Sequence, residues 1–302
     1  MPIRTQAGME NAQEILKQLD IERVPQEIFE LKEAVEQEEP NLVTVAQIIS
    51  RHPKLLGQFL SIANQVLRRD PDNLILDAHA AVNLLGLDEI EKVFLASYLE
   101  KQLPRSEYNI ELIKQNKRAA LVAAEISYWI NDLSRAEAYL VTFLQDVGAL
   151  YMARHFGLDY LGSFTYPQLE KPYSAHIEEV QKYQTSHAFL GSLISSRWKL
   201  GHLLSKSILL HHSHDLHKLI DYDRRIAHMV ALIHIANAIV YQEIDLKEGL
   251  EEDETPPSLP AELEESLTQG IEILQLPDNA LKAARSALEK WGMSGCDHFA
   301  SH

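Results

Sequence analysis

The 302-residue sequence is poor in cysteine and in long apolar runs. Cys296 is the only cysteine, so no disulfide can form within the chain, and we expect a reducing compartment. The first residues, MPIRTQAGMENAQEIL, lack the apolar segment of a secretion signal. The longest strongly apolar stretch, Met229–Tyr241, is interrupted by polar residues and is shorter than the about 20 residues that cross a bilayer. These absences predict a cytoplasmic protein with no membrane partner.

Positive charge is also scarce, since the formal net charge is -16. Between Tyr241 and Glu265 the chain has ten acidic residues and one lysine, a local net of -9 that leaves -7 elsewhere. Without a stripe of lysine and arginine, such a chain should be repelled by phosphate backbones, so we expect no nucleic-acid partner. The acidic run is typical of a solvated linker, with a docking motif as the alternative.

Motifs for several reaction classes are missing. The sequence contains no GxGxxG, GxxxxGK[ST], GxSxG or HExxH, which removes support for nucleotide-binding loops, a nucleophile elbow and a zincin site. Cys296 lies near the end of the chain, a poor place for a preorganised nucleophile. Segments with strict alternation of Val, Ile and Thr, which are typical of strands, are also missing.

Helical periodicity is what the sequence does have. Apolar residues recur at the 3.6-residue period in almost every segment, which predicts an all-α fold. Helices are expected over residues 42–49 and 53–67, joined by a tight corner at His52-Pro53, because the residue before proline avoids helical angles. A long helix is expected from about 109 to 130. After a surface loop at 158–172, helices should resume near residues 174, 186, 202 and 224.

Helix caps can also be read from the sequence. Asp77 and Asp88 are candidate N-caps of two helices, and Gly86 should end the first of them. Ser134 with Glu137 three residues later forms a capping box. It should start the helix that ends at Gln145-Asp146.

Composition divides the chain into five segments. The clearest boundary is the acidic stretch with the Pro256-Pro257 pair, which is typical of a linker. The predicted segments are a helical extension (residues 1–20), an amino-terminal helical part (21–105), a second helical part (106–245), the linker (246–260) and a carboxy-terminal helical hairpin (261–302).

Residue types that bind metals occur at four places on different predicted helices. These places are Asp146, His187, the His211-His212 pair followed by His214 and His217, and His234. Ligands from separate helices can converge on one borderline divalent metal. Each place also has a structural alternative, because Asp146 can act as a cap, His234 as a buried hydrogen-bonding residue, and the His211 run as the end of a helix. Spacing alone leaves both alternatives open.

From Ile21 to Val240 the sequence resembles the HDOD proteins, bacterial signalling domains related to HD phosphohydrolases. The family's "I-x-x-D-P-x-L…L-x-x-A-N" and "A-I-x-x-L-G" blocks have counterparts here, as does the HD-like half. The matching blocks are Ile48–Leu55 with Leu60–Asn64, then Ala80–Gly86, and then Phe143–Gly148, Ser186–Ala188 with Gly191 and Trp198, His211-His212 and Ile233–Asn237. The resemblance implies an HD-domain-like helical bundle packed on an amino-terminal helical subdomain.

Three metal ligands of active HD enzymes have no counterpart in this sequence. No histidine lies on the helix that carries Lys117, where the resemblance implies an early ligand. Gln145 replaces the histidine of the His-Asp pair, and Asn237 replaces a closing aspartate. Glutamine and asparagine are neutral and poor ligands for divalent cations. His52 replaces the usual aspartate before Pro53, a change at a corner without catalytic consequence.

The resemblance therefore implies an enzyme ancestor with a depleted site. A vestigial pocket is expected from Gln145, Asp146, His187, His211, His212 and Asn237. We expect no cofactor. If a metal is retained, it should be one divalent ion (Zn, Ni, Mn or Fe) on Asp146, His187, His211 and His212, because a two-metal clamp would lack most of its charge.

The leading hypothesis is a non-catalytic HDOD signalling module that acts in trans on signalling proteins, in the setting of two-component and cyclic-dinucleotide pathways that the resemblance implies. The alternative is a metal-dependent phosphohydrolase with a reduced, single-metal site. A third hypothesis is a sensor for a nucleotide-like small ligand in the vestigial cavity. A homo-oligomer is compatible with all three.

Overall fold

The computed structural model confirms the all-α class. It describes residues 3–70, 72–104, 106–157, 159–160, 168, 170–249 and 258–292, and these residues contain helices and no strand. None of the described helices is both long and apolar enough to cross a membrane.

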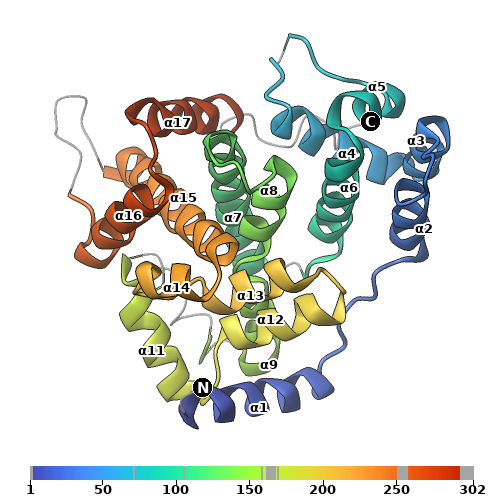
Figure 1. Cartoon of the computed structure of the whole chain (residues 1–302). Coiled ribbons are helices and arrows are strands. Elements are labelled where there is room, and N and C mark those ends of the chain that lie inside the picture. The colour runs from blue at the N-terminus through green and yellow to red at the C-terminus, as the bar shows by residue number, and fades with distance from the viewer. Residues whose placement is uncertain are drawn as a thin grey trace.

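The amino-terminal helices form one side of the molecule, apart from α1, which lies along its base (Figure 1). They are α1 (Ile3–Gln18), α2 (Gln26–Val35), α3 (Leu42–Ser50), α4 (Pro53–Val66), α5 (Ala78–Leu85) and α6 (Leu87–Gln102). Helix α4 packs on α6, α3 packs on α5, and α1 packs on α12 of the second part.

The second part surrounds a central pair of helices, α7 and α8, which pack on each other (Figure 1). Its helices are α7 (Glu107–Ile126), the 3-10 turn η1 (Ser127–Trp129), α8 (Arg135–Leu144), α9 (Val147–Phe156), α11 (Pro172–Tyr183), α12 (His187–Arg197), α13 (His202–Leu210), α14 (Leu216–Tyr222) and α15 (Arg224–Gly249). The hairpin follows as α16 (Ala261–Leu274) and α17 (Asp278–Gly292).

One contiguous apolar core runs through both parts, from Ala12 to Leu288. A buried polar network also joins them. Glu100 of α6 accepts hydrogen bonds from Lys117 of α7, at 2.5 Å, and from Gln58 of α4. Lys117 lies on the helix where the resemblance implies an early metal ligand. Its side chain instead helps to hold the two parts together.

Several local predictions are confirmed by the helix ends. Ser134 and Glu137 form the predicted capping box, and Asp77 caps α5 by accepting from the amide of Ala80. Gly86 ends α5 with a φ of 79°, a left-handed conformation that glycine adopts without steric cost.

Four local predictions differ from the structure. Asp88 is no cap: it lies inside the first turn of α6, where a carboxylate still favours the positive end of the helix dipole. The long helix ends at Ile126 and tightens into η1, and α14 was not predicted. Helix α15 continues to Gly249, into the range assigned to the linker. Most of the predicted loop at 158–172 lies outside the described residues.

The carboxy-terminal hairpin docks on the body, a point that the sequence left open. Helix α16 packs on α15, and α17 packs on α7. The contact with α15 is close at Gly270, where a Cβ atom would lie 2.8 Å from Cγ1 of Ile235 and 3.0 Å from the carbonyl oxygen of Ala231. Only a residue without a side chain fits there.

Candidate metal centre

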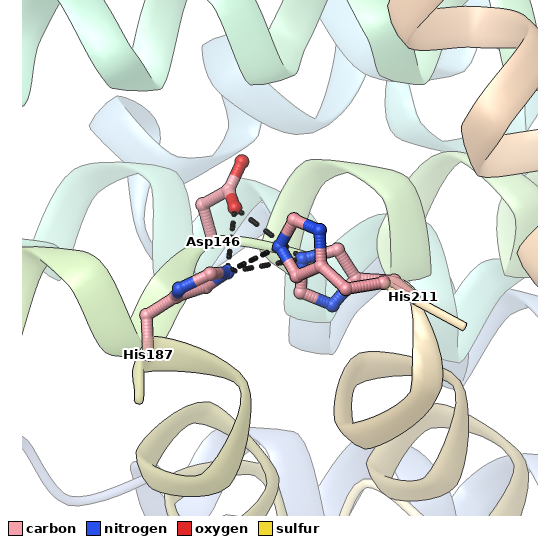
Figure 2. Close-up of side chains that lie close together, drawn as sticks. Asp146, His187 and His211 are labelled. Atoms are coloured by element: carbon pink, nitrogen blue, oxygen red, sulfur yellow. Dashed lines mark hydrogen bonds and ion pairs between the residues drawn. The ribbon is translucent and has the colours of Figure 1, made fainter. Parts of the chain in front are cut away.

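Asp146 lies at the corner between α8 and α9, where it is the N-cap residue of α9 without a side-chain capping bond. Its carboxylate is therefore not used by the helix and points toward His187 and His211 (Figure 2). Gly148 makes this position possible, because a Cβ atom there would lie only 2.0 Å from the carbonyl oxygen of His187 and 2.6 Å from the amide nitrogen of Gly191. The absence of a side chain brings α9 against α12, and Asp146 against His187.

His187 is the first residue of α12 and is fully buried. Its Nδ1 lies 2.7 Å from Oε2 of Glu179 on α11, and its backbone amide donates to Oε1 of the same carboxylate at 2.9 Å. Tyr160 also donates to Glu179, at 2.8 Å. The carboxylate thus holds the imidazole through Nδ1 and turns Nε2 toward Asp146, His211 and His212.

His211 and His212 follow the end of α13. The Nδ1 of His211 donates to the carbonyl oxygen of Ile208 at 2.6 Å, so its Nε2 carries the lone pair. His212 is stacked on His176, with ring centroids 4.7 Å apart. Burial, followed by the neighbouring histidines His211 and His176, keeps the pKa of His212 well below its usual range. A neutral imidazole is the form that binds metals.

The four ligand atoms converge on one point from three elements. Oδ1 of Asp146 lies 3.4 Å from Nε2 of His187 and 3.5 Å from Nε2 of His211. Nε2 of His187 lies 3.1 Å from Nε2 of His211 and 2.9 Å from Nε2 of His212. All four ligand atoms lie within 4.8 Å of one another. In a tetrahedral site with bonds of about 2.0–2.1 Å, ligand atoms are about 3.3–3.4 Å apart, so these separations fit one metal ion.

The charges of the cluster also favour a cation. Because Nδ1 of both His187 and His211 has an acceptor, their Nε2 lone pairs face each other and the carboxylate of Asp146. Glu179 adds a second buried anion: burial alone would raise its pKa, but the attraction of His187 and His176 outweighs this and lowers the pKa to about 2. A metal ion among these donors would offset converging lone pairs and negative charge.

Gln145 and Asn237, which stand where the resemblance implies metal ligands, meet in a second, neutral cluster. Gln145 donates to Asn237 at 2.9 Å and accepts from it at 3.0 Å, a reciprocal amide pair. Nε2 of Gln145 also donates to Oδ1 of Asn116 at 3.3 Å, so α7 contributes the third side chain of this cluster. Gln145 and Asn116 are buried, and the amides satisfy one another. This cluster offers no anion to a second metal.

A small cavity of about 30 Å³ borders both clusters. Asp146, His211, His212 and Asn237 line it, whereas Gln145 and His187 lie behind its wall. Because one water needs about 10–15 Å³ by this measure, the space suits an ion with one or two waters. A nucleotide would need the wall to move.

The other predicted candidates lie outside the ligand cluster. His234 is buried and bonds through Nε2 to the carbonyl oxygen of His211 at 2.7 Å, so it orients a ligand residue. His214 and His217 are exposed and face Glu265 and Glu272 of α16. The structure brings together Asp146, His187, His211 and His212, and separately Gln145 and Asn237.

Sequence reasoning missed three residues of this region. Glu179 and His176 are one turn apart on α11, with their ligand atoms near Nδ1 of His187. Asn116 completes the amide cluster. The spacing His176-x-x-Glu179 places both on one face of a helix, which was the available signal. No local pattern marked Asn116.

The buried His234 predicts a pH-dependent stability of the metal-free protein. Burial lowers its pKa from 6.5 to about 4, against the opposing effect of the bond to His211. The unfolded chain therefore takes up a proton below pH 6.5, while the folded chain does so only near pH 4. The free energy of unfolding should fall by roughly 3 kcal/mol as the pH drops through this window.

Urea denaturation at pH 7 and pH 4.5, in the presence of a chelator, measures this effect. His234→Gln is the control, because glutamine can still donate to the carbonyl of His211 but does not titrate. It should show a smaller difference between the two pH values than the wild type. Equal differences in both proteins would show that His234 is not the titrating group.

The helical bundle with its buried cluster of His and Asp has an HD-like fold, and comparison with known proteins narrows the class. Residues 21–214 match the HDOD domain family. The chain belongs to the HDOD family, as the sequence blocks indicated.

Solved structures share this fold over nearly the whole chain. A protein of Shewanella amazonensis named a "putative metal-dependent phosphohydrolase" is 16% identical, with a TM-score of 0.65 over 96% of this chain and 100% of that one. An HDOD domain protein of Geobacter sulfurreducens with unknown function is 18% identical, with a TM-score of 0.63 over 95% and 99% of the two chains. A "putative signal transduction protein" of Marinobacter aquaeolei is 15% identical, with a TM-score of 0.53 over 94% and 66%. At these identities the likeness shows the fold.

A curated relative is an uncharacterized protein of Treponema pallidum. It is 22% identical over 196 residues, which are 64% of this chain. The match spans only 38% of that relative's length.

Proposed function

We propose that this chain is a non-catalytic HDOD signalling module whose regulatory state depends on one divalent transition metal held by Asp146, His187, His211 and His212. The observation that carries the proposal is the convergence of four protein ligand atoms within 4.8 Å of one another, with four of the six separations between 2.9 and 3.5 Å. Sites closed by four protein ligands are structural, whereas hydrolytic sites keep a position open for water. The bound metal would supply a fixed charge that ties three helical elements together.

The amide cluster supports the non-catalytic part of the proposal. A two-metal phosphohydrolase clamps the attacking and leaving oxygens between its ions. Here the corresponding second position would be bordered by Gln145, Asn116 and Asn237, which are neutral and bonded to one another. The Marinobacter neighbour, named for signal transduction, is consistent with a regulatory role in trans, toward signalling proteins.

The donor set suggests which metal the site prefers. Three imidazoles and one carboxylate suit Zn, with Ni, Mn or Fe as other candidates. Glu179 and the carbonyl of Ile208 supply the outer hydrogen bonds that such ligands require.

A second candidate function is a single-metal phosphohydrolase. It is favoured by the small cavity beside Asp146, which has room for about two waters. If only Asp146, His187 and one of His211 and His212 held the metal, a water could take the fourth position, and the site would then have the open position of a hydrolytic centre. The name of the Shewanella neighbour agrees with this alternative.

Metal analysis of protein purified without a His tag tests the proposal. We expect about one equivalent of metal per chain, and intense visible bands of tetrahedral Co(II) after exchange. We expect no hydrolysis of phosphodiesters or nucleotides with added Mn. Less than about a tenth of an equivalent, with no Co(II) uptake, would remove the metal from the proposal.

Turnover that depends on metal and is abolished in Asp146→Ala would decide for the hydrolase. A matched control is Asp215→Ala, since Asp215 is an exposed carboxylate that caps α14 outside the centre. The control should keep full metal content.

A further inference from the structure

Helix α16 forms part of the wall of the metal centre, although it lies beyond the HDOD family match. Leu263 and Ser266 of this helix line the same cavity as Asp146, His211 and His212. Both α16 residues are buried. The carboxy-terminal hairpin therefore covers the ligand cluster as well as packing on α15.

Glu262 of α16 provides the amino-terminal cap of α11. The N-cap residue of α11, Lys171, makes no side-chain capping bond, and proline occupies the first helical position. The next two amides, of Tyr173 and Ser174, donate to Oε2 of Glu262 at 2.9 and 3.1 Å, and the hydroxyl of Ser174 donates to Oε1. A carboxylate from a distant helix thus satisfies donors that the local sequence leaves open. Although burial alone would raise its pKa, the hydrogen bonds from Ser174 lower the pKa of Glu262.

Helix α11 connects this cap to a ligand. Five residues after Ser174 on the same helix, Glu179 holds Nδ1 of His187 at 2.7 Å. The Nε2 of the same ring is one of the four ligand atoms. Glu262, α11, Glu179 and His187 form one chain of direct contacts from the hairpin to the centre.

Helix α16 also contacts the segment that follows the His211-His212 pair. Gln269 accepts from the amide of Leu216 at 3.4 Å, and Glu265 lies 3.2 Å from Nε2 of His214. The next residue, Gly270, packs against α15 at Ala231 and Ile235. One helix thus contacts the elements that carry or orient three of the four ligands.

We infer that α16 is a clamp on the metal centre, with Glu262 as a positioning residue that fixes His187 through α11 and Glu179. The inference rests on the proposed metal site and adds its regulation: metal binding strengthens the docking of the hairpin, and docking strengthens metal binding. Thermodynamic linkage requires the two effects to be equal in size. The docking of the hairpin then depends on whether the metal is bound, and this difference reaches the surface of the molecule.

Metal affinity of Glu262 variants tests the clamp. In Glu262→Ala the cap of α11 is lost, and we expect Co(II) affinity to fall about tenfold, the low end of the range for residues that orient a ligand from outside the coordination shell. Glu262→Gln keeps one acceptor oxygen and should lose less, about threefold. The Co(II) bands should weaken or shift in the alanine variant as His187 loses its fixed orientation. Glu264→Ala is the matched control, because Glu264 is an exposed carboxylate on the same helix, and it should bind as the wild type does.

Hydrogen exchange gives a second measurement on the wild-type chain. Amides of α16 should exchange about ten times more slowly with Zn bound than with a chelator, while those of α3 should not change. The clamp would be overturned, and the proposed function would stand, if the wild type binds metal and Glu262→Ala keeps its affinity within twofold. The same holds if the wild type binds metal and the α16 amides exchange at the same rate with and without Zn. Wild-type protein that binds no metal would overturn both. If the alanine variant does not fold, the glutamine variant and the wild-type exchange decide.

Discussion

Gly148→Ala should cost the protein about 3 kcal/mol of unfolding free energy or more. An added Cβ would lie 2.0 Å from the carbonyl oxygen of His187 and 2.6 Å from the amide nitrogen of Gly191. Both are backbone atoms, so no flexible side chain can move aside, and α9 must separate from α12. Adding a methyl group to a packed core typically costs about 1–3 kcal/mol, and the highest values come from rigid surroundings. Urea denaturation followed by circular dichroism measures the loss.

The same chain offers a matched control for this substitution. Gly57 lies inside α4, and an added Cβ there meets nothing within 4 Å. Gly57→Ala should therefore stabilise the protein by about 0.5–1 kcal/mol, because alanine loses less conformational freedom in a helix. A Gly148→Ala protein with the denaturation midpoint of the wild type would show that α9 and α12 do not approach as closely as the structure has them.

Replacing His187 by alanine should abolish metal binding for practical purposes, with an affinity loss of more than about 100-fold. Loss of a partner that only orients a ligand already costs about 10–100-fold, and His187 supplies a ligand atom itself. The substitution also takes from the buried carboxylate of Glu179 its hydrogen bond to Nδ1 of His187. Leaving a buried charged group without one of its hydrogen-bond partners costs about 1–3 kcal/mol or more, so the variant should also be less stable. Isothermal titration with Zn and denaturation of the metal-free protein separate the two effects.

His217→Ala is the control for this experiment. His217 is exposed, lies near Glu272 and contributes no ligand atom. Its loss should change neither metal affinity nor stability beyond about 0.5 kcal/mol. His187→Ala with Zn affinity within tenfold of the wild type would contradict a centre built from these four residues.

The helical fold could be predicted because its signals are local. The 3.6-residue period, the Ser134-Glu137 capping box and the His52-Pro53 corner each act within a few residues, and the structure has all three. Asp88 failed as a cap because Gly86 both ends α5 and begins α6, leaving no separate N-cap position for an aspartate. The short helix α14 lacked a long periodic pattern, and α15 extended beyond the expected linker boundary.

The candidate site could be predicted only as a set of residue types. Gln145, Asp146, His187, His211, His212 and Asn237 were named from ordered blocks and from departures within them. Their distances were not available, because they are spread over four separate segments of the chain and convergence depends on packing. Glu179 and Asn116 were missed for the same reason: a carboxylate on a polar helix and an amide on a long helix are ordinary until a partner is placed beside them.

Sequence alone determined which chemistry is present: helices throughout, one anion and three imidazoles as candidate ligands, and neutral amides at two of the three further positions where the resemblance implies ligands. Tertiary structure alone decided how these groups combine. Because Gly148 and Gly270 let helices touch, the four ligands meet at metal-binding distances, and α16 closes over them. The amides meet separately and satisfy one another. The contact between Gln145 and Asn237, which are 92 positions apart, follows from the packing of whole helices, which no local spacing specifies.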